Sequence, residues 1–198
     1  MAMIVDLDQS LSMWLLDALK PAIHEEFVVT FQPPDQLPDS PKVPAIDLFL
    51  YDVKQNLDQR SNEWIVERQP DGKATQKRAP VQVTCAYLIS AWPAAGEDPV
   101  EQEHLMLGEV LKLLLANPKI PAKFLQGSLR GLDTAIAATA VQPGAQNVTD
   151  LWRAFGGKAK AALNYSVNVG VEVGQPQDSY LVTRKTIKFE LVEGVESD

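Results

Sequence analysis

The sequence is poor in the side chains that most often carry out covalent catalysis. Its 198 residues include one cysteine and two histidines, so a cysteine–histidine pair would have to bring Cys85 to His24 or His104. Cys85 lies in an apolar, alternating segment, where a free cysteine usually behaves as a small buried hydrophobe. His104 lies beside glutamates at the start of a predicted helix. We therefore expect a core cysteine, a solvated His104 and no enzymatic activity. The alternative is a small-molecule-binding or hydrolytic domain that uses Cys85 or His104.

A disulfide, a signal peptide and a membrane span are also missing. One cysteine cannot form an intramolecular disulfide, which is typical of a protein made in a reducing compartment. The N-terminal segment Met-Ala-Met-Ile-Val-Asp has neither the basic region nor the apolar core of a signal peptide. The longest apolar segment is interrupted by Glu109 and Lys112 and is shorter than the roughly 18 residues of a spanning helix. We expect a soluble chain that is not secreted when first made and does not insert into a membrane.

Grouped basic residues are absent as well. The net charge is −8, and the 18 lysines and arginines are scattered along the chain. Proteins that bind nucleic acid through its phosphates carry clustered lysine and arginine. The negative balance is typical of a soluble surface, and we expect no nucleic-acid partner.

The sequence contains no GxGxxG, Walker, GxSxG or HExxH motif. His24 lies beside two glutamates, but no further ligand follows at metal-binding spacing. Asp47 lies inside an apolar strand segment, where a buried carboxylate needs a partner, and we expect a structural salt bridge with Arg60 or Arg78. The sequence therefore predicts no catalytic residue, no metal site and no cofactor.

Amphipathic spacing predicts helices. Residues 7–20 carry apolar side chains at helical intervals, with Asp6 or Asp8 as a possible cap and Pro21 as a stop. The second helix is predicted over 100–117. Its expected cap is Asp98, and its expected buried residues are Leu105, Leu107, Val110, Leu111, Leu114 and Leu115.

A further helical pattern covers residues 148–163. Gly156 and Gly157 lie inside it and disfavour a helix by roughly 2 kcal/mol, so we expect a kink or a break there. Residues 122–142 fit either a strand or a short helix, and the small side chains favour a strand.

Alternating apolar residues predict strands. Both faces of the segment 46–53 are apolar, which is typical of a central strand covered on both sides. Five of the fourteen prolines fall in residues 33–44, so this segment is predicted to be a loop. The remaining predicted strands are 27–31, 64–68, 73–78 (a hairpin with 64–68 around Asp-Gly), 81–91, 165–173 and a C-terminal β-arm at 180–192. Together these elements predict an α+β fold over residues 1–198: a single domain with a mostly antiparallel sheet flanked by two main helices.

The order of these segments resembles the tail-terminator, or cap, protein family of phage-tail-like contractile injection systems. The matching segments include "FLYDVKQNLDQR", "APVQVTCAYLISAW" and "EQEHLMLGEVLKLLLANP". The residues that carry the resemblance are Leu50, Tyr51, Asn56 and Arg60; Pro80, Tyr87, Leu88 and Ile89; Glu103, His104, Leu107 and Gly108; and Leu151, Trp152 and Tyr165.

The resemblance implies a structural protein that closes the far end of the inner tube and its contractile sheath. It implies a ring, usually a hexamer, without a cofactor or a reaction. The expected partners are further copies of the chain and the sheath and inner-tube proteins of the particle. The expected location is the bacterial cytoplasm during assembly and then the particle. The alternative within this class is another adaptor at the tube or baseplate end.

Two segments are candidates for subunit, sheath or tube contacts. The hairpin combines aromatic and basic side chains, which are favoured at interfaces, and the C-terminal arm alternates as a strand added to a neighbour would. The alternative for the arm is the last strand of the protein's own sheet. The candidate interface residues are Trp64, Arg68, Lys73, Lys77, Arg78, Arg184, Lys185, Ile187 and Phe189.

Overall fold

The computed structural model describes residues 3–38, 41–61, 63–68, 73–96, 98–132, 135–142, 148–154 and 159–180. The chain forms two compact units. The first unit comprises residues 1–61 and 80–171, and the second comprises residues 62–79 and 172–198. The predicted α+β class, with mostly antiparallel strands and two main helices, is confirmed.

The first unit is built on a five-stranded sheet with the order β1-β2-β5-β7-β6. β1 runs parallel to β2, and all other neighbours are antiparallel. The strands are β1 (Val28–Thr30), β2 (Ala45–Gln55), β5 (Val81–Trp92), β6 (Ala137–Ala140) and β7 (Ala162–Val171).

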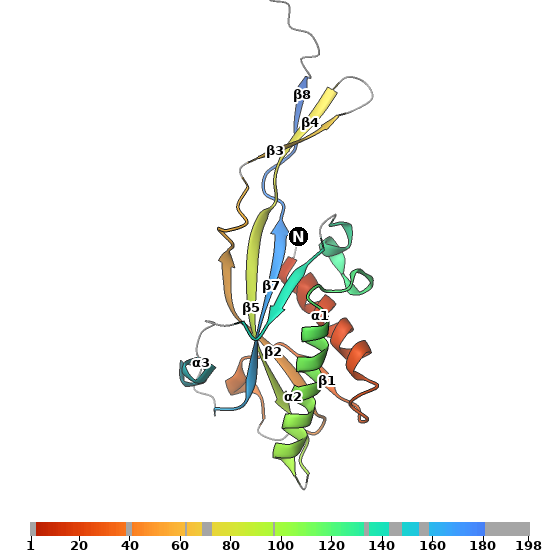
Figure 1. Cartoon of the computed structure of the whole chain (residues 1–198), viewed down its shortest axis with the longest axis vertical. Coiled ribbons are helices and arrows are strands. Elements are labelled where there is room, and N and C mark those ends of the chain that lie inside the picture. Colours follow the sequence, from red (N-terminus) through yellow and green to blue (C-terminus); the bar gives the residue numbers. More distant parts are fainter. Residues whose placement is uncertain are drawn as a thin grey trace, which may run out of the picture. The chain divides into compact units, whose positions relative to one another are not determined.

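Two long helices cover one face of this sheet (Figure 1). They are α1 (Met3–Leu19) and α2 (Pro99–Ala116). From α1, Leu7, Leu11 and Trp14 are buried in one core with Cys85 and Tyr87 of β5. Because side chains alternate along a strand, Leu88 points to the opposite face, where it packs against Trp92 and the short helix α3 (Val148–Ala154).

The start of α1 is attached to a loop that is remote in sequence. The Asp6 carboxylate accepts hydrogen bonds from the Ser128 backbone N–H at 2.9 Å and from its hydroxyl at 2.6 Å. Ser10 accepts one from the Gln126 N–H at 2.9 Å. Gly127 lies between them at φ 52°, and a Cβ there would overlap the Asp6 carboxylate. The loop contains the 3-10 helices η2 (Ala122–Phe124) and η3 (Gly127–Gly131).

The second unit is a three-stranded antiparallel sheet with the order β3-β4-β8. Its strands are β3 (Trp64–Arg68), β4 (Lys73–Arg78) and β8 (Gln177–Tyr180). The predicted hairpin of 64–68 with 73–78 is confirmed, and Trp64 lies directly opposite Arg78.

Several boundaries differ from the sequence predictions. α1 begins at Met3, so Asp6 and Asp8 lie within the helix and are not its caps. Among the described residues of the segment 122–142, only 137–140 form a strand, because η2 and η3 occupy the earlier part. The proline-rich segment contains one short 3-10 helix, η1 (Pro34–Gln36).

The helix predicted over 148–163 is wrong at its C-terminal end. The described part of α3 covers Val148–Ala154, residues 159–161 are not helical, and Leu163 belongs to β7, which begins at Ala162. Gly156 and Gly157, which disfavour a helix, separate the two elements in sequence and lie outside the described residues.

The predictions for α2 and β2 are right in part. Asp98 caps α2 as predicted, but Leu105 and Leu115 are 55% and 60% exposed, so they do not belong to the buried stripe. Among the described strands, β2 has neighbours on both sides only at its first three residues, because β1 is short. The expected central position therefore holds for its beginning alone.

Candidate assembly surfaces

The candidates for chemistry lie apart from one another. Cys85 is fully buried in the core of the first unit, as predicted, and burial together with the nearby charge of Asp8 raises the pKa of its thiol to about 11. His104 is exposed on α2, also as predicted. Within the described ranges, no three His, Cys, Asp or Glu side chains gather where they could hold a metal ion. No helix in the same ranges is long and apolar enough to cross a membrane.

Asp47 is buried without the arginine partner that the sequence led us to expect. Its Oδ1 accepts hydrogen bonds from the Thr30 hydroxyl at 2.8 Å and from the Gln32 backbone N–H at 2.9 Å. Its Oδ2 has no partner among the described residues. Burial raises the pKa of Asp47 to about 6, and these two hydrogen bonds oppose the shift. The carboxylate therefore ties β2 to the strand beside it, which is a structural task.

An ion pair with little exposure joins α2 to the segment before β7. The Lys160 ammonium lies 2.9 Å from the Glu103 carboxylate, and each side chain is 15% exposed. Lys160 also donates to the Ala91 carbonyl at 2.9 Å and lies 4.1 Å from the centroid of the Trp92 ring. Glu103 is one of the residues that carry the family resemblance, and in this structure its ion pair joins α2 to the segment before β7.

The sheet of the second unit has hardly any core of its own. All five residues of β3 are exposed, including Trp64 at 46%, Ile65 at 39% and Val66 at 44%. Ala74 is the one buried apolar residue in the described part of this unit. A three-stranded sheet needs a hydrophobic face, or a helix packed against it, to be stable by itself. These apolar side chains therefore mark a surface suited to a partner.

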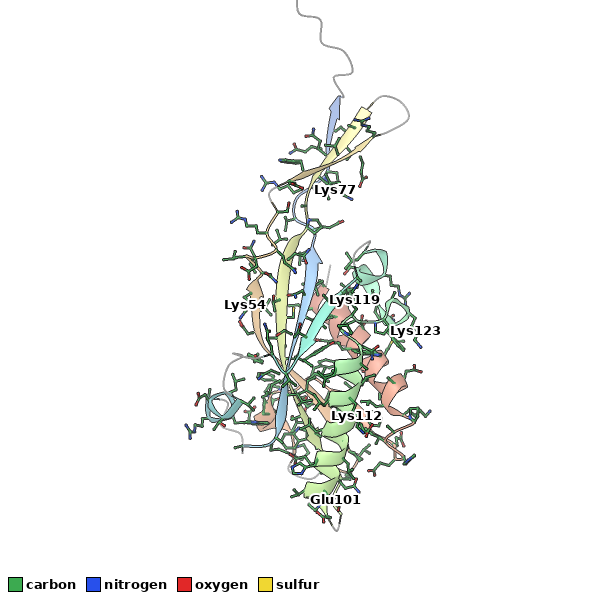
Figure 2. All side chains as sticks on the ribbon, viewed as in Figure 1. Lys54, Lys77, Glu101, Lys112, Lys119 and Lys123 are labelled. Atoms are coloured by element: carbon green, nitrogen blue, oxygen red, sulfur yellow. The ribbon has the colours of Figure 1, made fainter. Side chains whose placement is uncertain are left out.

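The strand register divides the hairpin's side chains between two faces. Trp64 and Arg78 are directly opposite, and the guanidinium lies 5.4 Å from the centroid of the indole ring. Arg68, four residues from Trp64, lies on the same face because side chains alternate. Lys77, labelled in Figure 2, lies on the other face and forms an ion pair with Glu67 at 2.7 Å.

The candidate interface residues thus separate into groups. The structure brings Trp64, Arg68 and Arg78 to one face and Lys77 to the other, while the backbone of Lys73 pairs with Tyr180. The residues that sequence reasoning missed are Ile65 and Val66, whose apolar alternation is equally typical of a buried strand. The remaining candidates, Arg184, Lys185, Ile187 and Phe189, lie outside the described residues.

A polar groove lies on the face of the five-stranded sheet that carries α3. It has a volume of about 480 Å³ and is lined by short polar side chains, among them Thr84, Ser166 and Asn168. Asn168 accepts hydrogen bonds from the Thr84 hydroxyl at 2.6 Å and from the Asn56 side chain at 3.3 Å. The Tyr51 hydroxyl on β2 donates a hydrogen bond at 3.4 Å to Asn164, which lies on β7 like Asn168. Such a face offers hydrogen bonds to another polar surface.

An apolar patch lies on the helical side of the first unit. Two adjoining hollows, of about 510 and 440 Å³, share Ile23, His24 and Glu25 in their lining. Leu16 and Leu105 line them from α1 and α2, and both are exposed. This patch is a second apolar surface open to a partner.

The chain matches one protein family and is similar to two solved structures. The family described as the Pvc16 N-terminal domain matches residues 6–182. No curated protein sequence matches the chain. Among solved structures, the chain is similar to the sheath/tube terminator, in the extended state, of an extracellular contractile injection system named PVC, with 23% identity and a TM-score of 0.69. It is also similar to the tube-terminating cap of the anti-feeding prophage, with 22% identity and a TM-score of 0.61.

These likenesses extend over most of the chain. They cover 98% and 91% of it, respectively, but only 65% and 60% of the two solved chains. The chain therefore spans less than two thirds of the length of each. At these identities the two structures share its fold, and the resemblance predicted from the order of its segments is confirmed.

Proposed function

The chain belongs to the Pvc16 N-terminal domain family, and we propose that it is a structural protein that caps the inner tube and contractile sheath of a phage-tail-like injection system. One observation carries the proposal: the fold of a sheath/tube terminator extends over 98% of the chain. In this role the protein performs no reaction and uses no cofactor. Its partners are the sheath and inner-tube proteins, and it is located in the bacterial cytoplasm during assembly and in the particle afterwards.

The protein acts as a closed ring, with six copies as the expected number. A ring with the rotational symmetry of a tube can bind all subunits of the last tube layer at once. The exposed sheet of the second unit supplies a contact surface that its own fold leaves uncovered. We assign the contacts between subunits or with the tube to Trp64, Arg68, Lys73, Lys77 and Arg78.

The C-terminal residues Arg184, Lys185, Ile187 and Phe189 continue the chain beyond β8 and are assigned to the same contacts. Their sequence alternates as a strand does, and an added strand satisfies the free backbone groups of a sheet edge. We propose that the domain over residues 1–198, including an arm at 180–192, is the unit that assembles into the ring.

The test is to locate the chain on particles. The chain, carrying an affinity tag, is co-expressed with the tube, sheath and baseplate proteins of its own particle, and tagged particles are imaged with gold-labelled antibody. We expect label only at the end opposite the baseplate, and tubes of uncontrolled length when the chain is omitted. Label at the baseplate end would instead assign it as an adaptor there, and particles without label would overturn the proposal.

The copy number has its own measurement. Native mass spectrometry of the chain released from purified particles should give a closed assembly of about six copies, the number that the resemblance to tail terminators implies, since homo-oligomers are usually closed and symmetric. Release as single chains under conditions that keep tube rings intact would contradict the ring.

A further inference from the structure

The two sheets of the protein differ in how their edges are protected. β2 pairs with β1 over three residues, and beyond them its register with β5, on the other side of the strand, has a bulge or irregularity between Leu50 and Asp52. Lys54 and Asp52 form an ion pair there at 3.5 Å, and Figure 2 shows Lys54 on this strand. Bulges and charged side chains are the devices by which proteins keep an open edge from pairing with another strand. The edge of β2 is protected by both.

The edge of β3 has neither kind of protection over most of its length. Its sequence, Trp-Ile-Val-Glu-Arg, begins with three residues of high strand propensity. Its register with β4 runs from Trp64–Arg78 to Arg68–Ala74 without a shift, so the strand has no bulge. Its two charged residues, Glu67 and Arg68, lie at the end of the strand, and Glu67 forms an ion pair with Lys77 at 2.7 Å, so the first three positions of the edge carry no charge. Among the described strands β3 pairs with β4 alone, so a straight edge is open to a further strand.

The same sheet ends in a second open edge. β8 pairs with β4 and with no other strand in the described part of the chain. β3 and β8 are both antiparallel to β4, and they therefore run parallel to each other. When copies are arranged around a rotation axis with their sheets in line, β8 of one copy meets β3 of the next in parallel orientation. One repeated contact then satisfies both open edges.

We propose that β3 of each copy pairs in parallel with β8 of the neighbouring copy, so that the three-stranded sheets join into one closed barrel. This inference rests on the proposed ring and names the contact that closes it. A ring of about six copies contributes about eighteen strands, the number at which a barrel encloses an open aqueous channel. Trp64 and Val66 lie on one wall of this barrel, and Ile65 lies on the other.

Disulfide trapping tests the pairing on assembled particles. Gln177→Cys on β8 is combined in turn with Trp64→Cys, Val66→Cys and Arg68→Cys on β3. Gln177 lies in the same cross-strand row as Val66, through Gln76, so all four positions share one face. Neighbouring strands lie about 4.8 Å apart, within the reach of a disulfide. The native Cys85 is fully buried and gives little background.

We expect one of the three pairs to give, after mild oxidation, a ladder of cross-linked chains that ends at the closed ring. The matched control combines Gln177→Cys with Ile65→Cys. Ile65 lies on the same strand but on the opposite face, so this pair should not cross-link. Cross-linking of the control as readily as the three test pairs would show non-specific proximity and overturn the pairing.

Hydrogen exchange gives a measurement that needs no substitution. In the wild-type ring, amides of residues 64–68 should exchange at least tenfold more slowly than in the dissociated chain. The protected edge of β2, residues 52–55, should exchange equally in both. A ring that native mass spectrometry finds intact, but whose β3 amides exchange unchanged and whose three cysteine pairs stay separate, would overturn the barrel and leave the cap function standing. A chain absent from particles would overturn both.

Discussion

The two tryptophans Trp14 and Trp64 show how differently the two units are built. Trp14 on α1 is 2% exposed and packs in a core shared by two helices and a sheet, whereas Trp64 on β3 is 46% exposed. The first unit buries its large side chains within one chain. The second unit presents the same kind of side chain to its surroundings. The comparison teaches that the first unit has a buried core of its own, whereas the second unit leaves its largest side chain exposed.

The largest expected effect is the loss of Trp14. Trp14→Ala should lower the free energy of unfolding by about 3–5 kcal/mol, because it leaves a cavity in the core of the first unit. Urea denaturation followed by circular dichroism measures the change. A loss below about 1 kcal/mol would show that this core does not hold the fold.

The next effect concerns the buried Asp47. Since its pKa is raised to about 6 in the folded chain from 3.8, the folded state binds the proton more tightly than the unfolded state does. The contribution of this group to stability is therefore full below pH 3.8 and falls as the pH rises through about 6. Asp47→Asn should remove this decline, worth up to about 3 kcal/mol.

The measurement is urea denaturation of Asp47→Asn and of the wild type at pH 4.5 and 7.5. The difference between the two proteins should favour the variant more at pH 7.5. Asp58→Asn, at an exposed position after the same strand, is the control and should change stability by less than about 0.5 kcal/mol. A difference that does not vary with pH would contradict the raised pKa.

A smaller loss is expected at the ion pair of Lys160. Lys160→Met should cost about 2 kcal/mol, because Glu103 loses its partner in a site with little exposure while the aliphatic stem over Trp92 is kept. Thermal unfolding gives the value. The matched variant Lys112→Met, at an exposed ion pair on α2, should cost under about 0.5 kcal/mol. Equal losses in the two variants would contradict the prediction that the less exposed ion pair contributes more to stability.

The smallest effect on folding is expected in the second unit. Trp64→Ala should change the free energy of unfolding by less than about 1 kcal/mol, because an exposed side chain loses few contacts. It should nevertheless abolish or weaken the ring, since large aromatic side chains contribute most to interfaces. Native mass spectrometry of Trp64→Ala beside wild type compares assembly. A variant that unfolds as readily as Trp14→Ala, or that assembles normally, would remove the contrast between the units.

The spacing of apolar residues in the sequence predicted many of the elements of the two units. The alternation of residues 81–91 and the helical spacing of residues 7–20 identified β5 and α1, because each buries one continuous apolar face. The Asp-Gly turn identified the hairpin of the second unit. The start of α1 at Met3 was missed, because its attachment through Asp6 and Ser128 joins residues 122 positions apart.

Exposure was harder to predict than secondary structure. Ile65 and Val66 follow the same apolar pattern as a buried strand, and only the absence of a covering layer in the described part of the second unit exposes them. Leu105 and Leu115 fit the helical stripe of α2 but lie beyond its edge. Asp47 was expected to pair with an arginine, but it accepts hydrogen bonds from the Thr30 hydroxyl and the Gln32 backbone N–H, because β1 runs parallel beside it. Periodicity describes one element at a time, whereas burial depends on its neighbours.

The burial of Cys85 has a consequence for the protein's chemistry in different surroundings. The only thiol is enclosed, and its raised pKa keeps it protonated, so oxidants and alkylating agents meet no thiolate on the folded chain. No disulfide therefore forms on the folded chain when the conditions change from reducing to oxidising. A protein built in this way can pass from one redox environment to another without disulfide exchange.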